Sequence, residues 1–241
     1  MENIITYQNI KKEYSENIIV DNFNLSIEKG EFVSIIGSSG CGKTTILKMI
    51  NGLVTPNSGD LLVFGENIKD VNMIEHRRKI GYSIQGSVLF PHMNVYDNIL
   101  YVPNLSKKSK DLDSLVDTWL DIVKIDRSLK HRYPNELSGG QQQRVGIARA
   151  LISSPKILLM DEPFGAVDEI TREQLQDELK EIHRKNDITI LFVTHDIKEA
   201  LKLGTKVLVM NKGEIHQYDS PENIINNPKT EFVKKLVKKA V

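Results

Sequence analysis

The chain has 241 residues and carries 32 basic (Lys plus Arg) and 32 acidic (Asp plus Glu) side chains, so its formal net charge is zero. A neutral chain has no bulk attraction for phosphates or anionic lipids, which argues against a nucleic-acid partner. A single cysteine cannot form an internal disulfide, which is typical of a reducing compartment. No apolar stretch approaches the roughly 20 residues that cross a bilayer, so we expect any membrane role to come through a partner.

The first third of the chain predicts three strands, a loop and a helix. Residues 4–10 and 18–27 alternate loosely between apolar and polar side chains, as strands of a mixed sheet do. After a turn at 28–31, residues 32–36 predict a buried strand, followed by a loop rich in Gly and Ser and a helix at 45–51. Two further short strands are expected at 61–64 and 80–84.

The rest of the chain predicts a helical insertion followed by a return to alternating strands and helices. Residues from about 92 to 152 are helical in pattern, with one helix over 139–152. The later strands are expected at 156–160, 188–194, 207–210 and 214–218, and the later helices at 169–185 and 197–203. This alternation favours a parallel α/β core.

Residues 37–44, GSSGCGKT, match the pattern G-x-x-x-x-G-K-[ST] of a phosphate-binding loop. Glycines let successive backbone N–H groups point at one anion, and the following helix adds its positive end. We expect Lys43 to reach the β- and γ-phosphates, and the Thr44 hydroxyl, with Thr45 nearby, to bind Mg²⁺. The plain alternative is a Gly/Ser turn. Cys41 is interpreted as a small residue that fits the loop, with a modifiable thiol as the alternative.

Two acidic residues, Asp161 and Glu162, directly follow an apolar run from Ile157 to Met160 that predicts a buried strand. Ligands of parallel sheets bind at the carboxyl edge, so we expect Asp161 to be an outer Mg²⁺ ligand and Glu162 to be the general base or the group that orients water. An acidic turn that caps the strand is the alternative. His195 follows another strand and is a candidate sensor of the γ-phosphate.

Residues 137–141, LSGGQ, form the most specific string in the chain. A Ser hydroxyl and two Gly N–H groups at a helix start can form a second anion site. The alternative is a plain helix start with Ser138 as its cap.

With these motifs in order, the sequence resembles the nucleotide-binding subunits of ABC transporters over nearly its whole length. Tyr14 lies 29 residues before Lys43, where family members stack an aromatic ring on adenine, and Gln85 resembles the glutamine that contacts Mg²⁺ and water. Residues 164–168 resemble the D-loop and 194–196 the H-switch. Taken alone, Tyr14 and Gln85 would be plain surface residues.

The resemblance implies an ABC cassette: a P-loop NTPase with a RecA-like core, an N-terminal antiparallel β region and an α-helical insertion. It implies a core over about 1–88 and 156–241 and a helical subdomain over about 89–155. Family members of the same branch often carry paired CBS domains, which we do not expect here after Val241.

The resemblance also implies the site. Glu162, His195 and Gln85 would be catalytic, and Thr44, Gln85 and Asp161 would bind Mg²⁺. The residues expected at ATP are Tyr14, Gly37, Ser38, Ser39, Gly40, Cys41, Gly42, Lys43, Thr44, Thr45, Ser138, Gly139, Gly140, Gln141 and Asp168. Two copies would stack head to tail, with each ATP between the loop of one and residues 138–140 of the other.

The same resemblance implies the partners: separate membrane permease subunits and an extracytoplasmic substrate-binding protein. The chain would then lie peripherally on the cytoplasmic face of the membrane. Residues 77–82, 89–93, 133–136 and 161–172 are similar to the ATPases of quaternary-amine osmoprotectant importers, whose solutes include glycine betaine, carnitine, choline and proline betaine. The alternatives are importers of another solute, such as ergothioneine, a sulfonate or an amino acid, and a soluble ABC ATPase without a transport role.

Two further segments carry expectations. We expect residues 85–93 to receive a permease helix in a groove, through Leu89 and Phe90, with ordinary core packing as the alternative. We expect residues 231–241 to form a solvated helix, with contact to a membrane surface as the alternative.

Overall fold

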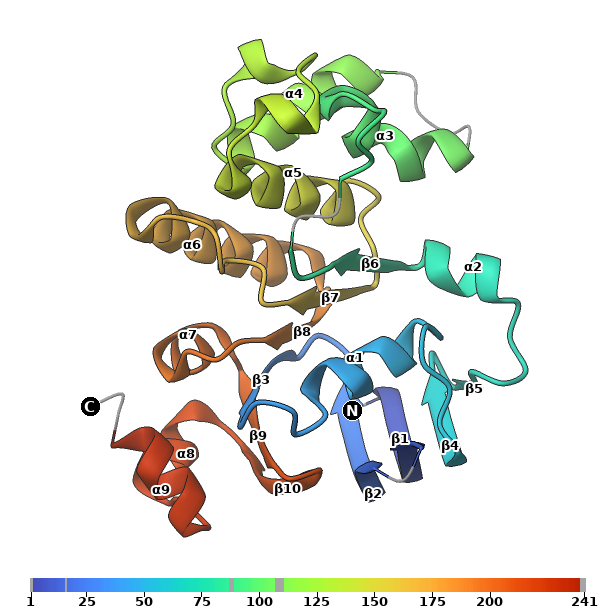
Figure 1. Cartoon of the computed structure of the whole chain (residues 1–241), viewed down its shortest axis with the longest axis vertical. Helices are drawn as coiled ribbons and strands as arrows, with labels where there is room; N and C mark the ends of the chain where they lie inside the picture. The colour runs from blue at the N-terminus through green and yellow to red at the C-terminus, as the bar shows by residue number, and fades with distance from the viewer. Residues whose placement is uncertain (1, 16, 87–88, 107–110, 239–241) are drawn as a thin grey trace. The chain divides into compact units, whose positions relative to one another are not determined.

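The computed structural model describes residues 2–15, 17–86, 89–106 and 111–238, which form two compact units (Figure 1). The first unit comprises Met1–Arg77 and Asp187–Val241, and the second comprises Arg78–Asn186. Within the described ranges, no helix combines the length and the apolar character that crossing a membrane requires.

The first unit holds an antiparallel sheet in the order β2-β1-β4-β5. Its strands are β1 (Asn3–Tyr14), β2 (Asn17–Glu28), β4 (Ser58–Val63) and β5 (Glu66–Asn67). The period-two alternation seen in the sequence buries one face, because alternate side chains of a strand point to the same side. Tyr7 and Phe23 meet edge to face on that side, with ring centroids 5.3 Å apart.

A second sheet of the first unit carries the phosphate-loop motif. Strands β3 (Phe32–Gly37), β8 (Thr189–Val193) and β9 (Lys206–Asn211) are parallel, and β10 (Glu214–Asp219) pairs with β9 in the antiparallel direction. Their continuous apolar runs are explained by burial on both faces. The helices of this unit are α1 (Lys43–Ile50), α2 (Met73–Arg78), α7 (Ile197–Leu203), α8 (Pro221–Asn226) and α9 (Glu231–Val237).

The second unit combines two parallel strands with a group of helices. Strand β6 (Ile80–Ser83) pairs with β7 (Ile157–Asp161). The helices are α3 (Val95–Ser106), α4 (Leu112–Ile122), α5 (Gly139–Leu151) and α6 (Glu169–Asn186), with 3-10 turns at Arg127–Leu129 and Pro134–Glu136. A Cβ at Gly81 would lie 2.3 Å from the carbonyl oxygen of Ala150, so glycine at this position lets α5 pack closely against β6.

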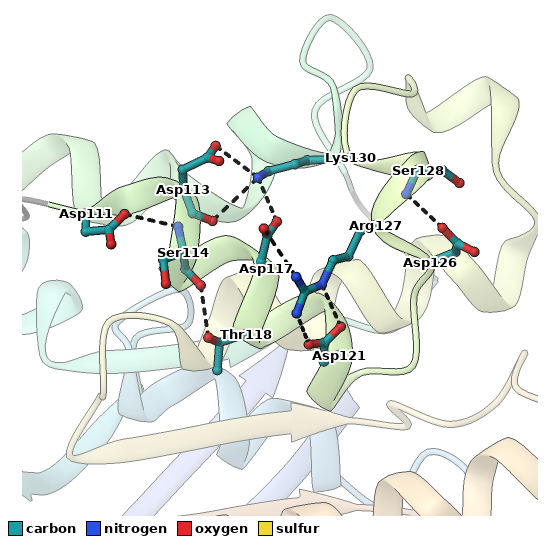
Figure 2. Close-up of polar contacts among 10 residues, drawn as sticks. All are labelled: Asp111, Asp113, Ser114, Asp117, Thr118, Asp121, Asp126, Arg127, Ser128 and Lys130. Carbon is teal, nitrogen blue, oxygen red and sulfur yellow. Dashed lines mark hydrogen bonds and ion pairs between the residues drawn. The ribbon is translucent and has the colours of Figure 1, made fainter.

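An acidic row on α4 is neutralised from the segment that follows it (Figure 2). Nζ of Lys130 lies 2.7 Å from Asp117 and 2.9 Å from Asp113, and the guanidinium of Arg127 pairs with Asp121 and Asp117. Residues four apart share one face of a helix, which places these acids in line. These ion pairs tie the 127–130 segment to α4.

The predicted α/β class with an N-terminal antiparallel region is confirmed. Helices α2 and α8 and the two-residue strand β5 were not predicted, because none of these short elements has a clear periodicity. The domain boundaries predicted at about 88–89 and 155–156 stay a prediction. The two compact units divide at other positions, so that β6, β7 and α6 belong to the same unit as α3 to α5.

The expectation of a solvated C-terminal helix is wrong for one face of the part that is described. Val233 is fully buried and Val237 is 8% exposed, in one apolar cluster with Ile36 and Val209. The spacing of four residues puts both valines on one face of α9, while its lysines face solvent. Residues 239–241 of the predicted helix lie outside the described residues.

Candidate functional site

The loop between β3 and α1 has the backbone that the phosphate-binding motif predicts. Gly40 and Gly42 have φ of +73° and +99°, a region that side chains with a Cβ rarely adopt, and Gly42 caps the start of α1. Thr44 and Thr45 lie in the first helical turn. Nζ of Lys43 donates to the carbonyl oxygens of Gly37 (3.0 Å) and Ser38 (2.9 Å), so the ammonium lies over the loop itself.

The base of this loop is packed against the end of β9. A Cβ at Gly37 would lie 2.0 Å from the carbonyl oxygen of Met210, so no other residue fits there. The Ser38 hydroxyl donates to Oδ1 of Asn211 at 2.9 Å. Asn211 follows the strand expected at 207–210, and nothing in the local sequence pointed to this contact. Cys41 is 2% exposed, which favours its interpretation as a small packing residue.

In the second unit, β7 ends in the two predicted acids. Asp161 is 2% exposed. Burial raises the pKa of the Tyr82 phenol on the neighbouring strand, and the charge of Asp161 adds to this shift. Glu162 follows with φ of +48°, the left-handed region. Nε2 of Gln85 donates to Oε2 of Glu162 at 2.9 Å. Two of the three residues predicted to be catalytic are therefore in direct contact.

The backbone of Glu162 is bound from α5. Nε2 of Gln143 donates to the carbonyl oxygen of Glu162 at 3.1 Å, and Oε1 of Gln143 accepts from the N–H of Ala166 at 2.9 Å. Gln143 is 4% exposed. Gln143 was not among the predicted site residues, and its only signal in the sequence was its position two residues after the LSGGQ string.

At the LSGGQ string, the structure shows the capped helix start that was the alternative to an anion site. Ser138 caps α5: its hydroxyl accepts from the N–H of Gln141 (3.2 Å), while the Gln141 side chain accepts from the N–H of Ser138 (2.8 Å). Ser138 and Gly139 are exposed at this helix start. The Ser138 hydroxyl accepts a hydrogen bond in the cap and would donate one in the predicted anion site, so the two roles are compatible and the anion site stays a prediction.

Asp168 lies at the start of α6 and is exposed. Its carboxylate accepts from the N–H of Thr171 at 3.0 Å. This backbone hydrogen bond, a side-chain bond from Thr171 and the charge of Arg144 hold the pKa of Asp168 below its usual value. Asp168 is therefore a charged, exposed group at the end of the 164–168 segment.

Two predicted site residues in the first unit are exposed. His195 lies in the loop between β8 and α7, flanked by Thr194 and Asp196. Hydrogen bonds of Thr194 hold this loop: its Oγ1 donates to Glu199 at 2.6 Å and accepts from the N–H of Asp196 at 3.0 Å. The Tyr14 ring is 47% exposed, with Nζ of Lys12 4.7 Å from its centroid. An open aromatic face suits stacking on a base.

A groove of about 290 Å³ lies within the second unit, lined by residues that include Tyr82, Ile84, Phe90, Tyr101 and Arg149. The Phe90 ring packs against two other side chains of this lining. Its centroid is 4.6 Å from the centroid of the Tyr101 ring and 5.2 Å from Cζ of the Arg149 guanidinium. These residues form a mainly apolar recess that is open to solvent.

The predicted role of Leu89 in this surface is wrong, because Leu89 is 6% exposed and belongs to the core. The loop that carries Phe90 is instead held by the side-chain amide of Asn98. This amide forms hydrogen bonds with the N–H and carbonyl of Phe90 and with the carbonyls of Met93 and Asn94. Residues 87–88 of the predicted surface lie outside the described residues.

Comparison with known proteins identifies the family to which the chain is similar. Residues 20–165 match the ABC transporter family model. The choline transport ATP-binding protein OpuBA of Bacillus subtilis is 47% identical over 98% of this chain and 62% of its own length. The glycine betaine uptake system ATP-binding protein YehX of Escherichia coli is 44% identical over 97% of this chain and 76% of its own length.

A solved ATP-binding cassette, a dimer in a post-hydrolysis state with ADP and Pi, has 31% identity and a TM-score of 0.83, covering 90% of this chain and 98% of that one. The predicted fold is thereby confirmed. The chain spans about three fifths of the length of OpuBA.

Proposed function

Because the chain belongs to the ABC transporter family, we propose that it binds and hydrolyses ATP as the energising subunit of an importer for a compatible solute. The observation that carries this proposal is the contact between Gln85 and Glu162 at the end of β7. An ionised carboxylate oriented by a neutral amide donor is suited to accept a proton from a water molecule.

The phosphate loop supports the binding step. Gly40 and Gly42 give the loop a positive-φ backbone, and Lys43 needs only to exchange two carbonyl partners for phosphate oxygens, which as anions are the stronger acceptors. The exposed Tyr14 ring would stack on adenine. We propose that the remaining residues expected at ATP, among them Ser138 to Gln141 and Asp168, act across a dimer of two such chains.

Mg²⁺ suits the donors predicted for it. The Thr44 hydroxyl, the Gln85 amide oxygen and the Asp161 carboxylate are all oxygen ligands, which this ion prefers. When bound, Mg²⁺ would neutralise charge on the phosphates. Glu162 would take the proton of the attacking water, Gln85 would hold the Glu162 carboxylate, and His195 would contact the γ-phosphate.

The groove around Phe90 supports a permease partner. A recess with aromatic walls and one cationic edge fits the amphipathic helix of a membrane subunit. We propose that the chain works peripherally at the cytoplasmic face of the membrane, with permease subunits and an extracytoplasmic substrate-binding protein.

The names of two relatives support a class of solute. OpuBA is a choline transport protein and YehX belongs to a glycine betaine uptake system. We propose glycine betaine, carnitine, choline or proline betaine as the solute class. An importer of another small solute is the second candidate.

Uptake by the reconstituted complex tests the proposal. The chain with its permease and binding protein in liposomes, supplied with Mg-ATP, should accumulate labelled glycine betaine or choline and raise its ATPase rate when the solute is present. Lys43→Ala is the control that should abolish both. ATP hydrolysis that ignores every quaternary amine would refute the solute class, and failure to hydrolyse ATP would refute the whole proposal.

A further inference from the structure

The Glu162–Ala166 turn is bridged by a single buried side chain. The Gln143 amide donates to the carbonyl oxygen at the start of the turn (Glu162, 3.1 Å) and accepts from the N–H at its end (Ala166, 2.9 Å). One rigid amide therefore fixes the separation and direction of both ends. With 4% exposure, Gln143 has almost no contact with water that could replace these bonds.

The turn needs such a support because Glu162 has a backbone conformation that residues with a Cβ avoid. Its φ of +48° costs conformational energy and persists only where the surroundings impose it. The internal bond of the turn, from the N–H of Gly165 to the carbonyl of Glu162, is long at 3.3 Å. The direction in which the Glu162 side chain leaves the backbone thus depends on the Gln143 clamp.

We propose that Gln143 is a positioning residue for ATP hydrolysis: it holds the backbone of Glu162 so that the carboxylate is aimed at the attacking water. Gln85 holds the carboxylate end at 2.9 Å, and Gln143 holds the carbonyl end. This inference rests on the proposed ATPase function. Gln143 itself touches no reacting atom in this scheme and acts through Glu162.

The start of α5 is seated on the same turn. A Cβ at Gly140 would lie 2.8 Å from the carbonyl oxygen of Ala166, so the helix approaches the turn as closely as glycine allows. The LSGGQ end of α5 and the turn that carries Glu162 are therefore in contact at two places.

The first test is Gln143→Met, which keeps the length of the side chain and removes both hydrogen bonds. We expect kcat for ATP hydrolysis to fall about 100-fold, the loss typical of a misaimed catalytic group, with KM and nucleotide affinity changed by less than about 3-fold. A thermal melt establishes that the variant is folded.

The chain offers a matched control in Gln217 on β10. Gln217 is 2% exposed and makes the same pair of bonds, donating to the carbonyl of Asn227 at 3.1 Å and accepting from the N–H of Lys229 at 2.9 Å. Gln217→Met should lower the melting temperature by a similar amount and leave kcat near that of the wild type. Equal losses of kcat in the two variants would overturn the proposal.

A double-mutant cycle separates positioning from general damage. In a Glu162→Gln background the carboxylate is already lost, so Gln143→Met should lower the residual rate no further. Additive losses would mean that Gln143 acts on something other than Glu162 and would overturn the proposal. Wild-type hydrolysis in the same assay keeps this outcome distinct from a failure of the ATPase assignment.

The pH profile of Gln143→Glu gives an independent readout should the methionine variant not fold. The introduced carboxylic acid can donate to the Glu162 carbonyl only while it is protonated, and burial raises its pKa. Its kcat relative to the wild type should therefore rise as the pH is lowered from about 8 to about 6. A ratio that does not change with pH would contradict the clamp.

Discussion

Nε2 of Gln85 lies 2.9 Å from Oε2 of Glu162, although 77 residues separate them in the chain. The bond joins the end of β6 to the end of β7, two strands that pair in parallel within the second unit. Because an amide N–H does not give up its proton to a carboxylate, Gln85 orients the Glu162 side chain without protonating it.

This pair predicts the behaviour of Glu162→Gln. The substitution removes the proton acceptor and keeps the size of the side chain, so kcat should fall by about 10² to 10⁴-fold. Affinity for ATP should be retained, and ATP-bound dimers should accumulate in size-exclusion chromatography. Hydrolysis at the normal rate would show that Glu162 has another role.

Lys43→Ala should act on binding. The ammonium that now contacts the carbonyls of Gly37 and Ser38 is the proposed phosphate ligand, so its loss should weaken ATP affinity by 10-fold or more, as expected for a charge-assisted bond of about 1.5–3 kcal/mol. Isothermal titration with a non-hydrolysable analogue measures this. Lys48→Ala, at the other end of α1, is the control and should bind normally.

Tyr7 predicts a loss of stability at high pH. Burial raises the pKa of this phenol above its ordinary value of 10.0, and its hydroxyl donates to the carbonyl of Ile46 on α1 at 2.8 Å. A raised folded pKa gives stability that is complete below about pH 10 and is lost as the pH rises above it, because the unfolded chain releases the proton first.

Tyr7→Phe should therefore lower the free energy of unfolding by about 1 kcal/mol at pH 7. Between about pH 7 and about pH 11, the free energy of unfolding of the variant should fall by less than that of the wild type. Urea unfolding at the two pH values measures both effects. The same alkaline loss in both proteins would show that Tyr7 does not contribute to it. Tyr218, whose pKa is also raised by burial and by its bond to Glu31, accounts for a residual loss in the variant.

Phe90→Asp should uncouple the chain from its permease. The substitution replaces an aromatic ring whose centroid lies 4.6 Å from that of Tyr101 with a carboxylate, and a charge in the groove wall opposes an apolar partner. We expect the ATPase rate of the isolated chain to be retained and its stimulation by the reconstituted permease to be lost. Ile225→Asp, at another exposed apolar position, is the control. Full coupling in the Phe90 variant would remove the groove as the docking site.

Val233→Ala tests the corrected view of the C-terminal helix. The side chain is fully buried among Ile36, Val207 and Val209, so its truncation should lower the free energy of unfolding by about 2 kcal/mol. Lys235→Ala on the exposed face should change it by less than about 0.5 kcal/mol. Equal effects in urea unfolding would indicate that α9 is solvated on all sides.

Much of the fold followed from local patterns. The apolar runs at 32–36, 157–160 and 188–194 predicted buried strands, and the glycines before Lys43 predicted a tightly curled loop, in which Gly40 and Gly42 have positive φ. Each of these signals is contained in a few consecutive residues, because strand burial and glycine conformation are local properties. The same holds for Ser138, whose cap on α5 needs only the residue three positions later.

The amino-acid sequence by itself determined where the phosphate loop, the acidic strand end and the family motifs lie. Tertiary structure alone decided which groups meet: Gln85 with Glu162, Gln143 with both ends of the Glu162 turn, Ser38 with Asn211, and the buried face of α9 with the core. These contacts join residues far apart in the chain. Their partners are chosen by strand order and helix packing, which no local pattern encodes, because hydrogen bonds and burial depend on distance in space.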